Sequence, residues 1–433
     1  MSRIGVVGLG YVGLTTAACL ADLGHQVIGV DIDEGRLTIL RKSKLPIYEP
    51  GLEELVERGT RSGRLSYTSR IEKGLEQAEF VFLAVGTPPD RRGGADLTAL
   101  KVAAEEIGRN LVDNLVVINK STVPIGTGDL VSDIVAKSRS SDKIAFSVVS
   151  NPEFLREGSA VNDFMHPDRV VLGGHDRVAA ERVAELYRPL ECPVLITDLY
   201  TAEMIKYASN AFLATKISFI NEIARICEKL DADVSVVSEG MGMDRRIGAA
   251  FLDAGIGFGG SCFPKDVKAL ARMAQEMGYH PELLHTVMDI NRDMRNLVVD
   301  RLEELLGGLR GQRVGILGLS YKPNTDDLRE APAIDIIEAL LKRGAQVQAY
   351  DPVAMPRAKQ VLNGGVTYAR DAYGVAKKAD ALAVLTEWNQ FRSIDLKRLR
   401  TTMRRPVIVD GRNIWEPDRM RELGFVYRGI GRR

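Results

Sequence analysis

The stretch IGVVGLGYVG, at residues 4–13, is the strongest indication of fold in this 433-residue chain. A short apolar run leads into three glycines with GxGxxG spacing, and an apolar segment of helical spacing follows at residues 14–23. This order predicts a strand, a tight turn and a helix. A second strand is predicted at residues 26–30. The chain therefore begins with the β-α-β unit of a doubly wound α/β domain.

The glycines of this loop predict a dinucleotide site. Gly8 permits the tight turn, Gly10 lets the backbone reach a pyrophosphate, and Gly13 allows helix and strand to pack closely. Asp31 ends the second strand, where a carboxylate accepts hydrogen bonds from a ribose 2′-hydroxyl. Because Asp31 would repel a 2′-phosphate, the fingerprint favours NAD, with Arg36 bracing the adenosine side; NADP is the alternative that Arg36 leaves open. The predicted cofactor residues of the loop are Gly8, Gly10, Tyr11, Val12 and Gly13.

GFGGSCFPKD, at residues 257–266, places one cysteine in a glycine-rich turn before a predicted helix. Pro264 suits the first helical turn, and Gly278 ends the apolar spacing that follows. Cys262 is therefore expected at the helix N-terminus, where unpaired N–H groups and the charge of Lys265 favour the thiolate. A buried structural cysteine is the alternative, but the glycines and adjacent charges favour a nucleophile.

Further strands are predicted in the first half of the chain. Residues 80–85 and 115–119 are apolar and end in the loops GTPP and KSTVP, and residues 144–149 lead into SNPEFLREG. Ligands of open α/β sheets bind at such carboxyl-end loops. We expect the loops to line the same site as the glycine turn.

A long segment without glycine or proline, residues 201–232, predicts one helix. Lys206 and Asn210 are four residues apart and share a face of it, although a solvated polar stripe would give the same spacing.

A second glycine loop is predicted at residues 313–322, where RVGILGLSYK again indicates a strand and a glycine turn, with a helix at residues 333–343. The third glycine is missing, so this loop is expected to accept a different phosphate ligand.

These elements predict an α/β protein with two Rossmann-like doubly wound domains joined by a central helical region that contains a long helix. The predicted divisions are an NAD domain at 1–200, a helical domain with the cysteine loop at 201–300, and a second Rossmann-like domain at 310–433.

Composition excludes several classes of protein. The chain has 58 basic and 58 acidic side chains and no apolar run long enough to span a bilayer, so neither nucleic acid nor membrane is an expected partner. Its four cysteines, Cys19, Cys192, Cys227 and Cys262, form no CxxC pair, and its five histidines lack ligand spacing. We expect no metal site, no disulfide framework and a reduced, cytoplasmic setting.

The chain resembles the nucleotide-sugar dehydrogenases, the family that oxidises UDP-glucose or GDP-mannose, over essentially its whole length. The resemblance rests on the glycine fingerprint and on PIYEPGL (46–52), STVP (121–124), NPEFL (151–155), the cysteine stretch (257–266), GLSYKPNTDD (318–327) and DGR (410–412). It implies two successive oxidations at C6 of the sugar, each reducing one NAD. UDP-glucose is the favoured substrate and UDP-glucuronate the product.

The implied chemistry uses a cysteine as nucleophile. Cys262 would attack the intermediate aldehyde to form a thiohemiacetal, which a second hydride loss turns into a thioester. Lys206 and Asn210 would stabilise negative charge on the sugar O6. Asp266 and Glu153 are the candidate acids and bases for hydrolysis, and which of them acts in which step stays open. The predicted catalytic residues are Cys262, Lys206, Asn210, Asp266, Glu153 and Thr122, the last positioning the water.

The resemblance also implies that residues 310–433 bind UDP and that residues 201–300 form the dimer interface, and it assigns binding residues. For the nucleotide sugar they are Glu153, Phe154, Leu155, Arg156, Lys206, Asn210, Arg246, Phe251, Leu252, Asp253, Ala254, Gly255, Gly257, Lys322 and Arg412. For NAD, beyond the glycine loop, they are Asp31, Arg36, Thr87, Thr122, Glu157, Lys265 and Arg329. Arg246 is expected to reach in from a neighbouring subunit. Asp253 stands where some relatives carry lysine, so phosphate contact there should come from the backbone.

The resemblance implies a homodimer built on the long helix, with higher assemblies possible.

Three other functions are alternatives to the oxidation of UDP-glucose. A sister enzyme would act on GDP-mannose or UDP-N-acetylmannosamine with the same chemistry. A two-electron hydroxyacid dehydrogenase would make one NADH, and Cys262 would be incidental. A silent NAD- or UDP-binding sensor would have no need for the catalytic set.

Overall fold

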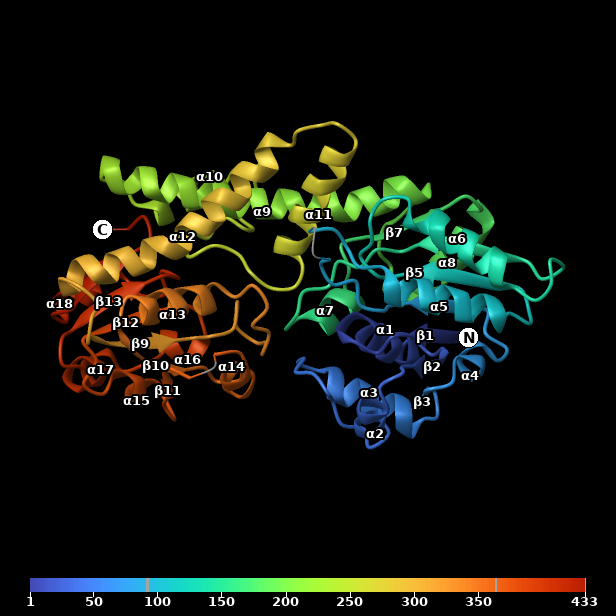
Figure 1. Ribbon diagram of the computed structural model, residues 1–433, viewed down its shortest axis with the longest axis horizontal. Helices are drawn as coiled ribbons and strands as arrows, with labels where there is room; N and C mark the ends of the chain where they lie inside the picture. The colour runs from blue at the N-terminus through green and yellow to red at the C-terminus, as the bar shows by residue number, and fades with distance from the viewer. Residues whose placement is uncertain (91–92, 363, 433) are drawn as a thin grey trace. The chain divides into compact units, whose positions relative to one another are not determined.

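The computed structural model describes residues 1–90, 93–362 and 364–432. The chain forms two compact units, Met1–Ser209 and Asn210–Arg433, and each is built around its own sheet (Figure 1). They are called the first and second unit below.

The first unit holds an eight-stranded sheet in the order β3-β2-β1-β4-β5-β6-β7-β8. Its strands are β1 (Arg3–Val7), β2 (Gln26–Val30), β3 (Leu65–Thr68), β4 (Phe80–Leu83), β5 (Leu115–Asn119), β6 (Phe146–Ser150), β7 (Val170–Gly174) and β8 (Val194–Thr197). The order of the first six is that of a dinucleotide-binding doubly wound sheet. The predicted strands in this region are confirmed, whereas β3, β7 and β8 were not predicted.

One pair of neighbours departs from the parallel arrangement. β6 and β7 are antiparallel, while the other neighbouring strands of this sheet are parallel. A parallel crossover needs a dozen or more residues with a helix that returns along the sheet. The connection at residues 151–169 holds the NPEFLREG loop and only the six-residue helix α7 (Ala160–Met165), so it contains no helix long enough to return along the sheet.

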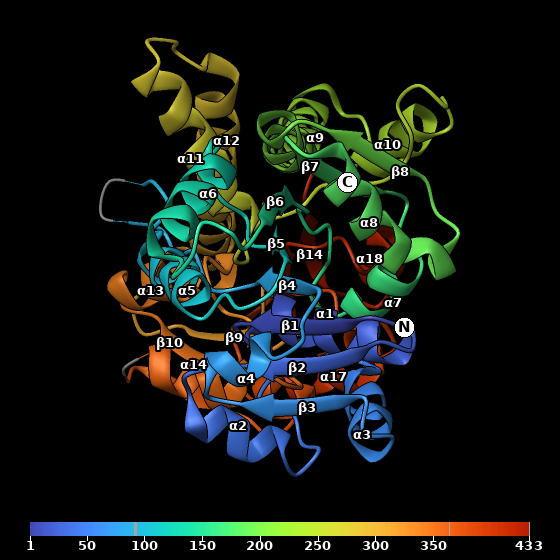
Figure 2. The same ribbon diagram turned by 90° about the vertical axis from the view of Figure 1, so that its right-hand side faces the viewer.

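Helices cover both faces of this sheet (Figure 2). The helices on one face are α1 (Tyr11–Asp22), α3 (Leu52–Arg61), α7 and α8 (Arg177–Tyr187), and those on the other are α4 (Ile71–Leu75), α5 (Thr98–Arg109) and α6 (Thr127–Ser138). The central strands are therefore buried on both faces, which explains why they read as continuous apolar runs. Burial of a side chain such as Phe82 or Ile118 contributes about 1.5–3 kcal/mol to the free energy of folding, relative to leaving it exposed.

The long helix is α9 (Leu199–Leu230), with 32 residues. It starts and ends two residues earlier than predicted, and Asp231 directly after it has a left-handed φ of 63°. The boundary between the two units lies within α9, and α10 (Val234–Gly242) follows.

The second unit contains a six-stranded parallel sheet in the order β11-β10-β9-β12-β13-β14. Its strands are β9 (Arg313–Leu317), β10 (Gln346–Tyr350), β11 (Val366–Tyr368), β12 (Ala381–Val384), β13 (Val407–Asp410) and β14 (Val426–Gly429). α12 (Glu282–Leu306), α13 (Pro332–Lys342) and α14 (Met355–Val361) pack on one face, and α15 (Ala372–Ala376), α17 (Leu396–Thr402) and α18 (Pro417–Glu422) on the other (Figure 1). The predicted fold class, two Rossmann-like domains with a central helical region, is confirmed.

Within the described ranges, none of the helices combines the length and apolar character that crossing a membrane requires.

Candidate active site

The first glycine loop joins β1 to α1 with the predicted geometry. Gly8 has a φ of 92°, and its N–H donates to the carbonyl of Val30 at 2.8 Å. A Cβ on Gly13 would lie 1.8 Å from the carbonyl oxygen of Gly8, so only glycine permits this approach. Gly10 precedes the helix, and nothing lies within 4 Å of the point where its Cβ would be. The helix N-terminus is thus accessible to a pyrophosphate.

Asp31 lies across this loop at the end of β2. Its carboxylate accepts hydrogen bonds from the N–H of Leu9 at 2.7 Å and of Asp33 at 2.9 Å. Arg36 pairs with it at 2.6 Å. The charge of Arg36 is therefore matched by Asp31, which favours a ribose hydroxyl over a 2′-phosphate at this position.

The loops after β4 and β5 are tied together. Thr87 donates its hydroxyl to the carbonyl of Thr122 at 2.7 Å, and Ser121 donates to the carbonyl of Val85 at 2.8 Å. Two predicted cofactor residues, Thr87 and Thr122, are thus neighbours at the carboxyl end of the sheet, where ligands of such folds bind.

A buried ion pair lies beside these loops. The ammonium of Lys206 is 3.0 Å from the carboxylate of Glu153, and both side chains are 4% exposed. Lys206 also lies over the ring of Phe154, 5.4 Å from its centroid. Burial raises the pKa of Glu153, but the charge and hydrogen bond of Lys206 and the N–H of Leu155 outweigh it and hold the pKa below its usual range. Glu153 is therefore a carboxylate at neutral pH.

A second lysine lies beneath the same loop. Lys120 is buried and donates to the amide oxygen of Asn151 at 3.0 Å, and Tyr187 donates to the same oxygen at 2.6 Å. Burial lowers the pKa of Lys120 to about 8, although the carboxylate of Glu153 acts against it. Lys120 therefore anchors the start of the NPEFL loop.

Cys262 lies at the N-cap position of α11 (Phe263–Glu276), and Pro264 is in the first turn, as predicted. Its sulfur is 3.5 Å from the hydroxyl of Ser261. Asp266, one turn later, is 1% exposed and accepts from the amide of Asn210 at 2.6 Å. Lys265 pairs with the other oxygen of Asp266 at 2.6 Å. The positive charge of Lys265 is thus compensated by Asp266, so it does not act on the Cys262 thiol alone.

The cysteine loop is held by α12. The side-chain oxygen of Asn291 accepts from the N–H of Phe258 at 2.7 Å, and its amide donates to the carbonyl of Phe258 at 3.0 Å. Gly257 has a φ of 90°, and a Cβ there would lie 2.3 Å from the Asn291 oxygen. Arg295 adds a bond to the Phe258 carbonyl at 3.2 Å. These bonds fix the backbone that leads into Cys262.

Arg412 joins three backbone segments of the second unit. It donates to the carbonyls of Leu385 at 3.0 Å, Tyr321 at 3.1 Å and Gly257 at 3.3 Å. The neighbouring segment, residues 251–257, packs against the same turn, and the N–H of Ile256 donates to the Gly411 carbonyl at 3.0 Å. Lys322 lies over the ring of Tyr321, 5.4 Å from its centroid. The 251–257 segment and Tyr321, the neighbour of Lys322, thus contact the DGR turn, whereas Asn210 and Arg246 bond to other residues.

Three predicted arginines pair with acids close to them in sequence. Arg156 pairs with Asp163 at 2.6 Å, Arg246 with Asp244 at 2.6 Å, and Arg329 with Asp327 at 2.7 Å. All three side chains are more than half exposed. A ligand phosphate would have to compete with these pairs.

The second glycine loop differs from the first. The carboxylate of Asp351, at the end of β10, is fully buried and accepts from the N–H groups of Leu319, Val353 and Ala354 at 2.8–2.9 Å. Trp388 also donates to it at 3.2 Å. Asp351 thus stands where Asp31 stands in the first unit and accepts backbone N–H groups in the same way, with Ala354 and Trp388 as additional donors. That this loop accepts a different phosphate ligand stays a prediction.

Three family models match the chain in order. They describe the NAD binding domain (residues 2–191), the central domain (200–293) and the UDP binding domain (315–417) of the UDP-glucose/GDP-mannose dehydrogenase family. The chain belongs to this family. It is an NAD-dependent oxidoreductase, and NAD is its cofactor.

Relatives within the family cover the whole chain. UDP-glucose 6-dehydrogenase TuaD of Bacillus subtilis (strain 168) is 48% identical over 100% of this chain and 94% of its own length. The UDP-glucose 6-dehydrogenase of Rhizobium meliloti (strain 1021) is 47% identical over 99% of both. Among solved structures, a UDP-glucose dehydrogenase from Pyrobaculum islandicum has a TM-score of 0.94 at 42% identity, covering 100% of this chain and 98% of that one. A UDP-D-ManNAc dehydrogenase from Pyrococcus horikoshii has a TM-score of 0.88 at 28% identity over 99% of both chains.

Two residues that the sequence analysis missed position the loops of this dehydrogenase. Glu203, buried on α9, accepts from the N–H groups of Gly126 at 2.6 Å and Gly128 at 2.8 Å, and so fixes the turn after STVP. Asn291 fixes the cysteine loop. An acid on the long helix and an amide on another helix carry no local motif, so only the fold reveals them.

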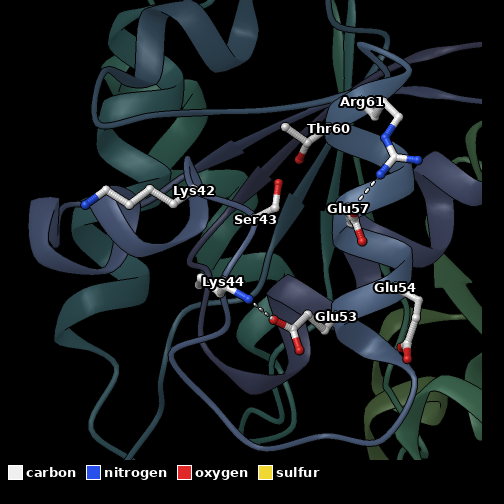
Figure 3. Close-up of a pocket in the computed structure, with 8 residues that line it drawn as sticks. All are labelled: Lys42, Ser43, Lys44, Glu53, Glu54, Glu57, Thr60 and Arg61. Atoms are coloured by element: carbon white, nitrogen blue, oxygen red, sulfur yellow. Dashed lines mark hydrogen bonds and ion pairs between the residues drawn. The ribbon is translucent and has the colours of Figure 1, made fainter.

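A hollow on the first unit of the dehydrogenase has none of the predicted site residues in its lining (Figure 3). It is lined by Lys42, Ser43, Lys44, Glu53, Glu54, Glu57, Thr60 and Arg61. Lys44 pairs with Glu53 at 2.9 Å, and Arg61 pairs with Glu57. These ion pairs compensate most of the charge in the lining, so the hollow gives no indication of a ligand. Nor do the described residues gather three or more His, Cys, Asp or Glu side chains as a metal site would.

Proposed function

We propose that this dehydrogenase oxidises UDP-glucose to UDP-glucuronate through a thioester on Cys262 and reduces two NAD for each sugar. One observation carries the covalent part: Cys262 occupies the N-cap of α11, one turn before the buried carboxylate of Asp266. Helix N-termini stabilise thiolates, which are the nucleophilic form of cysteine. The full-length relatives named UDP-glucose 6-dehydrogenase support the choice of substrate.

In the first oxidation the O6 proton is proposed to pass to a water molecule, and protein groups stabilise the negative charge that develops on O6. NAD, when bound, accepts one hydride from C6 in each of the two oxidations. Lys206 and Asn210 are proposed to stabilise the negative charge on O6. The aldehyde at C6 is the product of this step.

Cys262 is proposed to carry the second oxidation. Its thiolate adds to the aldehyde carbon, and O6 takes a proton, which gives a thiohemiacetal with a C–H bond at C6. Loss of that hydride and of the O6 proton leaves a thioester. Water then adds to the thioester carbon, the C–S bond breaks, and the carboxylate and the thiol are released.

Glu153 is the carboxylate we propose as general base for this hydrolysis. It is ionised at neutral pH because Lys206 holds its pKa below the usual range, so it can accept a proton from water. Thr122 is proposed to position the water. Asp266 has one oxygen bonded to Asn210 and the other to Lys265, and this suits a role in orienting Asn210.

The residues that hold the two ligands are proposed as follows. The accessible N-terminus of α1 and the carboxylate of Asp31 fit a dinucleotide, and Thr87, Glu157, Lys265 and Arg329 complete the NAD set. Phe154, Leu155 and Arg156 contact the sugar, and the 251–257 segment, Lys322 and Arg412 contact the nucleotide. Arg246 is proposed to act on a partner subunit's ligand. The proposed domains follow from these roles. Residues 1–200 bind NAD, residues 201–300 form the helical dimerisation region with the cysteine loop, and residues 310–433 bind UDP.

The stoichiometry of the reaction tests this function. With purified protein, excess NAD and limiting UDP-glucose, we expect about two NADH for each sugar consumed, because the thioester route removes two hydrides. The measurement is absorbance of NADH against sugar consumed, with GDP-mannose and UDP-N-acetylmannosamine run in parallel. A ratio near one would exclude the thioester. Activity only with another sugar would keep the chemistry and change the substrate.

We propose that the enzyme is a homodimer built on α9. Phe212, Phe219 and Ile226 recur on this helix at seven-residue intervals and are 44–65% exposed, and Leu230 near its end is 74% exposed. A heptad-spaced apolar stripe is the pattern that pairs helices. A cytoplasmic location is proposed as well, because four scattered cysteines without a CxxC pair favour a reducing compartment.

Charges on this stripe should separate the subunits. The Phe212→Asp/Phe219→Asp double variant is expected to run as a monomer in light scattering coupled to size exclusion, whereas wild type runs at twice the 47.5 kDa of one chain. Val178→Asp, an exposed apolar position on α8, is the control and should leave the wild-type mass unchanged. A monomeric wild type, or a dimeric double variant, would refute the α9 interface.

A further inference from the structure

One motif of the sequence has no role in the proposed chemistry. Glu49, in PIYEPGL, is 5% exposed and lies on the loop before α3. One of its oxygens accepts from the N–H of Gly158 at 2.6 Å and from the hydroxyl of Tyr11, and the other accepts from the N–H of Ala160 at 2.7 Å. Among the described residues Glu49 forms no ion pair, so uncharged donors alone compensate its buried charge.

These donors come from two different loops. Tyr11 is the first residue of α1, within the glycine fingerprint, whereas Gly158 lies at the end of the loop that carries Glu153 and Ala160 begins α7. The N–H of Gly158 also donates to the Tyr11 hydroxyl at 3.1 Å, which closes the triangle. Burial and the Glu49 carboxylate raise the pKa of Tyr11, so its hydroxyl keeps its proton and remains a donor.

A shared carboxylate transmits displacement between the loops that it holds. If Tyr11 moves when a pyrophosphate binds beside it, the hydrogen bonds to Glu49 change, and so does the support of Gly158 and Ala160. The same bonds act in the other direction when the sugar loop orders around its ligand. Two ligands that bias one element in this way bind cooperatively, and the effect is reciprocal.

We propose that Glu49 is a positioning residue that couples cofactor binding at the glycine loop to sugar-nucleotide binding at the NPEFLREG loop. This rests on the proposed function, which places the two ligands at these loops. Glu49 itself touches neither ligand.

The test is equilibrium binding of NADH, followed by its fluorescence, with and without saturating UDP-glucuronate. The ratio of the two dissociation constants measures the coupling and cancels any uniform loss of affinity. We expect about a fivefold or larger ratio in the wild-type chain. In Glu49→Gln one end of the side chain becomes an NH2 group that faces backbone N–H donors. In Tyr11→Phe only the hydroxyl is lost. Each variant should reduce the ratio below about twofold, and the double variant should reduce it no further, because the two residues act as one unit.

Matched controls lie nearby in sequence. Tyr48→Phe and Glu54→Gln alter exposed side chains, the second of which lines the hollow in Figure 3, and both should keep the wild-type ratio. If Glu49→Gln does not fold, Tyr11→Phe still decides. A wild-type ratio of one, or an unchanged ratio in Tyr11→Phe, would overturn the coupling. If wild type fails to bind UDP-glucuronate, the proposed function fails, and the ratio is then measured with the nucleotide sugar that the enzyme oxidises.

Discussion

Replacement of Cys262 by serine is expected to lower net turnover by on the order of a thousandfold or more, because the second oxidation then lacks its nucleophile. A serine hydroxyl is hardly ionised at neutral pH, even at a helix N-terminus, so the thiohemiacetal does not form. UDP-glucose affinity should change little, since the sulfur contributes only a small part of the contact with the substrate. Initial rates of NADH formation and calorimetric titration with UDP-glucose measure the two quantities.

Cys192→Ser is the matched control. Cys192 is partly exposed in the first unit and has no predicted role, so its replacement should leave both quantities near the wild-type values. A Cys262→Ser enzyme that still makes two NADH per sugar at a normal rate would remove covalent catalysis from the mechanism. A variant that has lost substrate binding would instead assign Cys262 to the binding site.

Lys206→Met is expected to lower turnover by about 100- to 1,000-fold, because it removes a cation from the proposed O6 site. It should also destabilise the fold by about 3–5 kcal/mol at neutral pH, since the carboxylate of Glu153 stays buried without its partner. Methionine keeps the length and apolar stem of lysine, so packing against Phe154 is largely retained. Steady-state kinetics and urea unfolding measure the two effects.

The same variant should invert the pH dependence that Glu153 contributes to stability. In wild type the pKa of Glu153 is held below its unfolded value of 4.5, so its contribution is present above that pH and is lost as the pH falls through the folded pKa. Without Lys206, burial is the dominant influence and raises the pKa above the unfolded value. The variant should then lose stability as the pH rises.

Urea unfolding at pH 5 and pH 8 distinguishes the two cases. Lys229→Met, at an exposed position near the end of the same helix, should behave like wild type at both pH values. If the loss of unfolding free energy relative to wild type were the same at pH 5 and pH 8, the destabilisation of Lys206→Met would not come from the buried, uncompensated charge of Glu153.

Much of the site was predictable because its signals are local. The roles of Gly8 and Gly13 follow from sterics within a few residues, and the structure gives them the positive φ and the close approach that the sequence predicted. Cys262 at the N-cap of α11 follows from the neighbouring proline and the apolar spacing. Asn210 and Asp266 were both named, but nothing in their spacing indicated that they bond to each other.

The strand, turn and helix of each local motif follow from the amino-acid sequence alone, and with them the fold class and the family. Local sterics and side-chain periodicity act over a few residues, so they can be read without knowing the fold. Hydrogen bonds between distant residues follow only from the tertiary structure. Examples are the bond of Glu49 to Gly158, 109 residues away, and the bond of Arg412 to Gly257, 155 residues away. The tertiary structure also turned β7 antiparallel and paired Lys206 with Glu153. Such contacts depend on how strands are ordered and how loops close in space, and periodicity along the chain contains no information about either.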